Sequence, residues 1–301
     1  MKKITGLLKS KKRLISDGAW GTFLHKMGLA PGECPELWNL THEKEVFEIA
    51  RSYIDAGADM IETNSFGGSR YKLKHFGLED KVYILNKAAA AISRKAAGEN
   101  KIVLGSIGPT GIILIMGEVS QEELYEAFKE QSVALADGGA DAIIIETMSD
   151  LEEAKIAIRA ARENTECEII CTMTFEKTQQ NEYRSIMGFA PGDVIQELIN
   201  SGADIIGANC GNGMEGMIEI TKEIRSVNSE IPLLIHANAG LPRYEEGETL
   251  FPETPVQMAS FIPQLIDAGA TIIGGCCGTT PEHIKKFSET VYDIQRIENN
   301  R

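Results

Sequence analysis

The sequence predicts an α/β protein that folds as a single-domain (β/α)8 TIM barrel. Three observations support this fold. Four segments resemble one another, and each has a glycine, an alanine and a polar residue directly before a short apolar run. Four further apolar runs complete an alternation of eight candidate strands with helix-like stretches. The chain has 301 residues, which is enough for eight strand–helix units, since this barrel typically needs about 250 residues.

The candidate strands are short and almost continuously apolar, which is typical of a parallel sheet covered on both faces. In the four similar segments, the glycine ends a helix and the strand follows at once. In chain order the strands lie in RLISDG near Leu14, DAGADMIETNSF from Asp55, KIVLGSIG near Val103, DGGADAIIIETMSD from Asp137, EIICTMTF near Ile170, NSGADIIGANCG from Asn200, PLLIHANAG near Leu234 and DAGATIIGGCCG from Asp267.

The helix-like stretches separate and follow these strands. Some begin with capping residues: Ser120 has Glu123 three residues later, and Thr280 precedes Pro281. The even repetition favours a closed barrel over an open doubly wound sheet, which is the main alternative. No Pro- or Ser-rich linker interrupts residues 1–301, so we expect one domain. The predicted helices span 43–56, 80–97, 120–137, 150–163, 191–201, 215–228, 255–268 and 281–296.

Two segments are expected to close the ends of the barrel. Residues 1–12 are predicted to form a helix at one end. Residues 18–40 have no strand or helix pattern and are predicted to form a long loop over the other end, the barrel mouth.

Composition and charge exclude several classes of function. The net charge of −14 would repel a polyanion, so we expect no nucleic-acid partner. No run approaches 18 consecutive apolar residues, so no membrane span is expected. The basic N-terminus has only a short apolar stretch and no small-residue cleavage site, which indicates a cytoplasmic protein.

Three of the six cysteines are predicted to meet at the barrel mouth. In such barrels function collects at the C-terminal ends of the strands. Cys210 ends the sixth candidate strand, and Cys276 and Cys277 end the eighth. The sequence GGCC suggests that two glycines let the backbone turn before the cysteine pair. Cys167 and Cys171 lie in apolar runs and are interpreted as buried free cysteines.

Three thiolates with one open position describe a catalytic Zn²⁺ site, because zinc prefers four tetrahedral ligands and binds sulfur well. The open position would accept a thiol substrate, whose pKa zinc lowers, and the resulting zinc thiolate could attack a methyl group. His236 is a possible fourth protein ligand, but a hydrogen-bonded neighbour is the preferred interpretation. Cys210, Cys276 and Cys277 are therefore predicted both to bind the metal and to act in catalysis.

Other interpretations of these motifs are possible. Cys276 and Cys277 could simply be packed together, or form a redox pair. A disulfide between adjacent residues would be strained, because consecutive Cα atoms lie about 3.8 Å apart and disulfides usually span about 4.4–6.8 Å. Residues 211–216, GNGMEG, match a dinucleotide-binding fingerprint. That fingerprint usually follows the first strand, not the sixth, so a glycine turn beside Cys210 is preferred.

Several motifs together resemble the homocysteine S-methyltransferase family. Within it the similarity is greatest to the homocysteine-binding module of cobalamin-dependent methionine synthase, and it covers nearly the whole chain. GGCCGT with the upstream NC is the most specific part. The motifs are DGAWGT at 17–22, TNSFGGSR at 63–70, GPTG at 108–111, ETMSD at 146–150, GANCG at 207–211, NAGLP at 238–242 and GGCCGTTPEH at 274–283.

The resemblance implies a barrel that methylates homocysteine to methionine, with zinc held by the three cysteines named above. It implies that Asp17 and Glu146 bind the amino group, and two carboxylates beside an ammonium are chemically reasonable. Asn64 is a third candidate substrate-binding residue at a strand end. The alternative interpretation is that Asp17 and Glu146 only cap a helix or stabilise a loop. Trp20 and Phe189 are bulkier than the family pattern suggests, so a different thiol remains an alternative substrate.

The methyl group is expected to come from outside the chain. A cobalamin-binding module carries D-x-H-x-x-G, and the nearest match here, FLHKMG, has Phe23 in place of the aspartate. Three sources remain open: a separate corrinoid protein carrying methylcobalamin, a free methyl donor, or a further module of a longer protein. The competing hypotheses are a non-catalytic zinc-binding interaction module and a redox or nucleotide enzyme.

Overall fold

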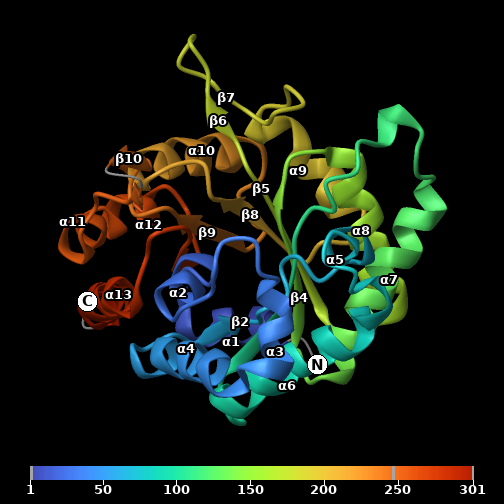
Figure 1. Ribbon diagram of the computed structural model, residues 1–301. Helices are drawn as coiled ribbons and strands as arrows, with labels where there is room; N and C mark the ends of the chain where they lie inside the picture. The colour runs from blue at the N-terminus through green and yellow to red at the C-terminus, as the bar shows by residue number, and fades with distance from the viewer. Residues whose placement is uncertain (1–2, 246–247, 300–301) are drawn as a thin grey trace.

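The computed structural model describes residues 3–245 and 248–299, which form a (β/α)8 barrel (Figure 1). Eight parallel strands form one sheet in the order β1-β12-β9-β8-β5-β4-β3-β2. The sheet closes because the Asp59 amide, just before β2, donates to the Ile15 carbonyl of β1 at 2.7 Å. The predicted fold is confirmed. The strands are β1 (Leu14–Ile15), β2 (Met60–Glu62), β3 (Ile102–Ile107), β4 (Ala142–Met148), β5 (Glu168–Met173), β8 (Ile205–Asn209), β9 (Leu233–Ala237) and β12 (Ile272–Gly275).

A ring of helices covers the outside of the barrel (Figure 1). Seven of the eight predicted helices are found within a few residues of their expected bounds. The eighth prediction, one helix over 255–268, is wrong, because the chain breaks into α11 and α12 at Phe261. Pro263 lies in the first turn of α12, where proline is tolerated, but it cannot extend α11, because it lacks the N–H and its ring clashes with the preceding turn. The outer helices are α4 (Glu43–Asp55), α6 (Val82–Ala97), α7 (Gln121–Asp137), α8 (Leu151–Asn164), α9 (Pro191–Asn200), α10 (Met214–Val227), α11 (Pro255–Ser260), α12 (Ile262–Asp267) and α13 (Pro281–Asn299).

Helix α1 (Lys3–Lys11) closes the N-terminal end of the barrel, as predicted; residues 1–2 lie outside the described residues. Ile4 is fully buried and packs in one cluster with strand residues such as Leu14, Met60 and Ile102. The Ile4 amide donates to a Glu168 carboxylate oxygen at 2.6 Å. Because one end is plugged by apolar packing, the opposite end is free to form a site.

The mouth of the barrel is more structured than expected. The prediction of a loop over 18–40 is wrong in part, because the segment contains a short helix over Gly21–Lys26, a 3-10 turn over Pro35–Leu37 and most of a second short helix over Trp38–Thr41. It does lie over the mouth, since Gly18, Trp20 and Glu36 line the cavity there. Two hairpins were not anticipated, and the β6–β7 hairpin projects away from the barrel (Figure 1). These elements are α2 (Gly21–Lys26), η1 (Pro35–Leu37), α3 (Trp38–Thr41), α5 (Arg70–Lys74), η2 (Glu79–Lys81), η3 (Leu114–Met116), β6 (Glu176–Lys177), β7 (Tyr183–Arg184), β10 (Arg243–Glu245) and β11 (Glu248–Leu250).

None of the helices in the described parts of the chain is long and apolar enough to cross a lipid bilayer.

Candidate active site

A cavity of about 260 Å³ opens at the C-terminal ends of the strands. Its deeper wall carries side chains from five strand ends, namely those of Glu62, Glu146, Cys210, His236 and Cys276. The segment 18–36 forms the outer wall. This is the position at which barrels of this type place their functional residues.

The three predicted cysteines meet in this cavity. The sulfur atoms of Cys210, Cys276 and Cys277 all lie within 4.8 Å of one another, and the Cys210 and Cys277 sulfurs are 3.9 Å apart. Within residues 3–245 and 248–299 this is the one cluster of three or more candidate metal ligands. A tetrahedral zinc with Zn–S bonds of about 2.3 Å places its sulfur ligands roughly 3.8 Å apart. The sulfur triangle therefore fits a zinc ion.

The backbone around these cysteines takes unusual conformations. Cys210 has a φ of +59°, which non-glycine residues rarely adopt. The prediction that Gly274 and Gly275 let the chain turn is wrong, since both lie inside β12 and neither has a positive φ. They provide space instead: a Cβ on Gly274 would lie 2.7 Å from the His236 ring, and one on Gly275 would lie 2.3 Å from the Thr279 hydroxyl.

The sulfur atoms interact strongly even without a metal. Hydrogen bonds from the Cys276 and Cys277 thiols lower the pKa of Cys210 to about 3. The same contacts raise the pKa of Cys277 to about 12 and that of Cys276 well above its ordinary value. The cluster therefore holds one thiolate that two thiols stabilise, and a cation would favour ionisation of all three.

His236 is not part of the cysteine cluster. Its ring is buried, and burial lowers its pKa to about 3, so the imidazole is neutral at physiological pH. Its Nδ1 lies 3.5 Å from Oε1 of Glu62. The preferred interpretation of this histidine as a neighbour of the site agrees with this geometry.

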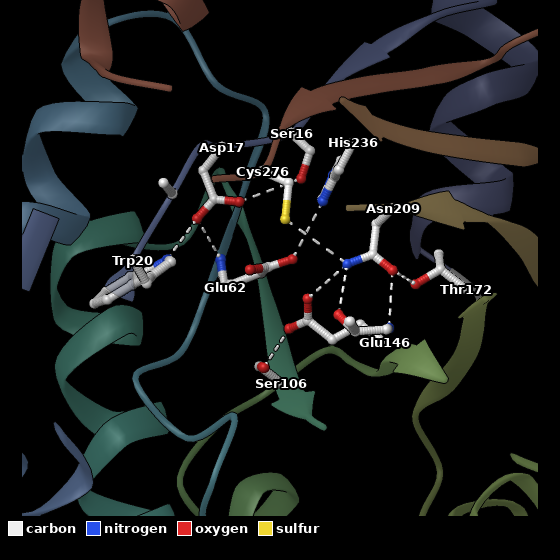
Figure 2. A network of polar contacts seen from close by, with 12 residues as sticks. Ser16, Asp17, Trp20, Glu62, Ser106, Glu146, Thr172, Asn209, His236 and Cys276 are labelled. Atoms are coloured by element: carbon white, nitrogen blue, oxygen red, sulfur yellow. Dashed lines mark hydrogen bonds and ion pairs between the residues drawn. The ribbon is translucent and has the colours of Figure 1, made fainter. Parts of the chain in front are cut away.

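Asp17 lies at the end of β1 and is fully buried. Its Oδ2 accepts hydrogen bonds from the Trp20 indole at 2.9 Å and the Glu62 amide at 2.8 Å, and its Oδ1 lies 3.4 Å from the Ser16 hydroxyl (Figure 2). Burial raises the pKa of Asp17 to about 6. Asp17 is not among the residues that line the cavity, so its predicted contact with substrate stays a prediction.

Glu146, near the end of β4, does face the cavity. Its carboxylate accepts hydrogen bonds from the Ser106 hydroxyl and, at 3.3 Å, from the Asn209 amide (Figure 2). Burial raises the pKa of Glu146 to about 7. Among the described residues no lysine or arginine lines the cavity, so this carboxylate has no cationic side chain of those two types beside it there.

Asn64 also lines the cavity, but its amide group braces the outer wall. The Asn64 Nδ2 donates to the Pro35 carbonyl at 2.7 Å and to the Asn39 side chain at 3.1 Å. These bonds hold the segment around η1 over the mouth. A substrate-binding role for Asn64 stays a prediction.

Asn209 was not selected as a site residue, although it directly precedes Cys210. Its side chain connects three strand ends (Figure 2). The Asn209 Oδ1 accepts from the Thr172 hydroxyl at 2.7 Å and from the Thr147 amide at 2.8 Å. Its Nδ2 donates to Glu146 and lies 3.9 Å from the Cys276 sulfur. The sequence signal that could have identified Asn209 is its position as a polar residue at a strand end, next to the predicted ligand Cys210.

The raised pKa of Glu146 predicts a pH-dependent stability for the metal-free protein. The folded state holds this proton up to about pH 7, whereas the unfolded chain releases it near the ordinary value of 4.5. The free energy of unfolding should therefore fall as the pH rises from about 4.5 to 7, by on the order of 3 kcal/mol for this group. Glu146→Gln should remove that part of the decrease. Urea titrations of both proteins at several pH values measure it, and parallel pH profiles would contradict the expectation.

Comparisons with known proteins agree with this geometry. The homocysteine S-methyltransferase family model matches residues 14–291. Methionine synthase from Mycobacterium tuberculosis is 31% identical over 307 residues, covering 96% of this chain and 25% of that protein. Methionine synthase from Mycobacterium leprae is 31% identical over 303 residues, covering 95% of this chain and 25% of that protein. The chain thus spans about a quarter of the length of these curated relatives.

One solved structure is similar along almost its whole length. The oxidized form of the homocysteine methyltransferase MmuM from Escherichia coli has a TM-score of 0.77 and 25% identity, covering 95% of this chain and 98% of that chain. The family model extends over most of the barrel, from the first strand to within the last helix. On this evidence, the chain belongs to the homocysteine S-methyltransferase family.

Proposed function

We propose that this chain is a zinc-dependent methyltransferase that converts homocysteine to methionine. The observation that carries the proposal is the triangle of Cys210, Cys276 and Cys277 at the wall of a cavity that also contains buried carboxylates. The three sulfurs would hold the ion and leave a fourth position facing the cavity. Zinc, when bound, lowers the pKa of a coordinating thiol so that the thiolate is present near neutral pH.

The side chains around the metal site would bind and orient the substrate. Glu146 and Asp17 would bind the substrate ammonium. Among the described residues these buried acids have no cationic partner, and an amino-acid thiol would supply one positive charge. Trp20 and Leu24 of the outer wall would limit the access of water to the thiolate. The methyl donor must then enter from the mouth, opposite the closed end formed by α1.

We propose a methylcorrinoid protein as the methyl donor. The support is that the curated relatives are named methionine synthase and are about four times as long as this chain. A chain that covers a quarter of such a protein would receive the methyl group from another part or from a separate protein. A different thiol in place of homocysteine is the alternative that the bulky Trp20 in the cavity wall favours.

A combined metal and donor assay tests the proposed function. We expect one zinc ion per chain by elemental analysis. With homocysteine, we expect methionine to form from methylcobalamin faster than from S-methylmethionine, S-adenosylmethionine or betaine. X-ray absorption at the zinc edge should show three sulfur ligands, and four after homocysteine is added.

Each failure of this assay has a separate meaning. Zinc that never gains a fourth sulfur from any thiol would indicate a non-catalytic zinc-binding module. A fourth sulfur from another thiol but not from homocysteine would change the substrate. Product formation from a different donor would overturn only the corrinoid proposal.

A further inference from the structure

We infer that His283 is a positioning residue for the metal site, because it holds residues 251–253 across the turn that carries Cys276 and Cys277. Residues 251–253, the strap, follow β11 directly. The inference rests on the proposed function. It assigns a role to two motifs that the zinc-binding cysteines do not account for, NAGLP at 238–242 and TPEH at 280–283.

The two ring nitrogens of His283 bind two different main-chain groups. His283 is 5% exposed and lies in the first turn of α13. Its Nδ1 accepts from the Thr280 amide at 3.1 Å, as a glutamate or glutamine does at this position of a capping box. Its Nε2 lies 3.0 Å from the Glu253 carbonyl oxygen, which can only accept a hydrogen bond. The ring is therefore held as the neutral Nε2–H tautomer, in agreement with the lowered pKa that burial gives His283.

The strap reaches the turn that carries Cys277 through main-chain hydrogen bonds. The Glu253 amide donates to the Ala239 carbonyl at 3.0 Å. The Ala239 amide in turn donates to the Cys277 carbonyl at 2.9 Å. Because each bond joins two main-chain groups, a displacement of the strap moves the backbone from which the Cys277 sulfur projects.

The NAGLP motif also holds the turn that carries Cys210. The amide of Asn238, its first residue, donates to the Asn212 carbonyl at 2.9 Å. The Asn212 amide donates to the Cys210 carbonyl at 2.8 Å. The motif is therefore connected to both cysteine-bearing turns, and the strap holds it from outside.

Two glycines let the strap pack at close range. Gly278 has a φ of +80°, and a Cβ at this position would lie 2.2 Å from the Phe251 ring. A Cβ on Gly240 would lie 3.0 Å from Cγ of Glu253. The strap thus lies directly on the turn after Cys277 and on the NAGLP motif, so the loss of its anchor at His283 would change the support of both.

A zinc ion needs this support because its ligands come from separate strands. The Cys210 and Cys277 sulfurs are 3.9 Å apart, yet they follow β8 and β12, which β9 separates in the sheet. The NAGLP motif and the strap both follow β9. Loss of a partner outside the ligand set commonly costs about 10–100-fold in metal affinity. Since His283 acts through the strap, we expect an effect at the lower end of this range.

Two substitutions of His283 separate positioning from packing. His283→Asn keeps an acceptor for the Thr280 amide but is too short to donate to the Glu253 carbonyl, whereas His283→Gln is long enough to do so. Competition with a chromogenic chelator on the full chain should show zinc binding about 10-fold weaker in His283→Asn and close to the wild type in His283→Gln. In the metal-free proteins, hydrogen exchange of the Ala239 and Glu253 amides should become faster in His283→Asn only.

Thr254→Ala is the matched control, because Thr254 directly follows the strap and its hydroxyl accepts from the Gln257 amide at 3.3 Å at the start of α11. It should lower the melting temperature and leave the zinc affinity unchanged. Wild-type zinc affinity in His283→Asn, or an equal loss in both His283 variants, would overturn the inference and assign the ring a packing role.

The wild type alone also tests the inference. Rapid, unprotected exchange of its Ala239 and Glu253 amides would show that the strap is not held, whether or not the variants fold. A wild type that binds zinc tightly but methylates no thiol would contradict the proposed function and leave the role of His283 in metal binding standing. A wild type that does not bind zinc would contradict both.

Discussion

Cys276→Ser is expected to abolish methyl transfer and to weaken zinc binding by at least roughly 100-fold. Even the loss of a supporting partner outside the ligand set commonly costs about 10–100-fold in metal affinity, and this change removes a ligand itself. A hydroxyl is a much poorer zinc ligand than a thiolate. Competition with a chromogenic chelator measures the affinity, and methionine formation measures the activity.

The barrel should survive this substitution. Cys276 lies just after β12, at the cavity, and not in the apolar packing inside the barrel. Circular dichroism and the melting temperature of the metal-free protein should therefore stay close to those of the wild type. Cys167→Ser is the matched control, because the Cys167 thiol is outside the sulfur triangle and contacts the Ala140 carbonyl at 3.5 Å. A Cys276→Ser protein that binds zinc as tightly as the control would refute the assigned metal site.

The sequence predicted the barrel well because its repeated signals are local. The glycine before each apolar run and the capping residues at helix starts depend on neighbours a few residues away. The convergence of Cys210 with Cys276 followed from topology alone, since parallel strands end at one face. That step did not require any side-chain coordinates.

The details of the mouth could not be predicted in the same way. The short helix α2 has no side-chain cap at its start, and neither it nor the β10–β11 hairpin has a strong local sequence pattern. Which acid faces the cavity is decided by strand register and side-chain direction. Asp17 and Glu62 both end strands, yet only Glu62 lines the cavity. The break at Phe261 is an exception, because Pro263 is a local sequence signal that indicates the end of the preceding helix.

The sequence also did not predict which site residues have a left-handed backbone conformation. Thr147 and Cys210 have φ values of +61° and +59°. A β-branched threonine is strongly disfavoured in this region, and such strain costs on the order of 1–3 kcal/mol. It persists only where the surrounding structure holds it, and here Asn209 accepts from the Thr147 amide at 2.8 Å and donates to its hydroxyl at 2.7 Å.

Asn209→Ala is therefore expected to have the second large effect. The substitution removes every bond that the Asn209 amide makes to Thr147, Thr172 and Glu146, and it leaves the Thr147 amide and the buried Thr172 hydroxyl without these partners. Each unsatisfied buried group costs about 1–3 kcal/mol, although partial relaxation makes the sum smaller. We expect a loss of roughly 2–4 kcal/mol in the free energy of unfolding, measured by urea denaturation of the metal-free protein. Homocysteine affinity should fall as well, because Glu146 loses one of its two donors.

Asn212→Ala separates this network from a general effect of removing a buried amide. Asn212 is also buried, but its Nδ2 makes one hydrogen bond, to the Phe175 carbonyl at 2.6 Å. This control should lose only about 1 kcal/mol and keep the homocysteine affinity of the wild type. If the two variants were equally stable and bound homocysteine equally well, Asn209 would not connect the acids to the metal site. If Asn209→Ala alone lost both stability and affinity, the strain at Thr147 and the orientation of Glu146 would depend on the same side chain.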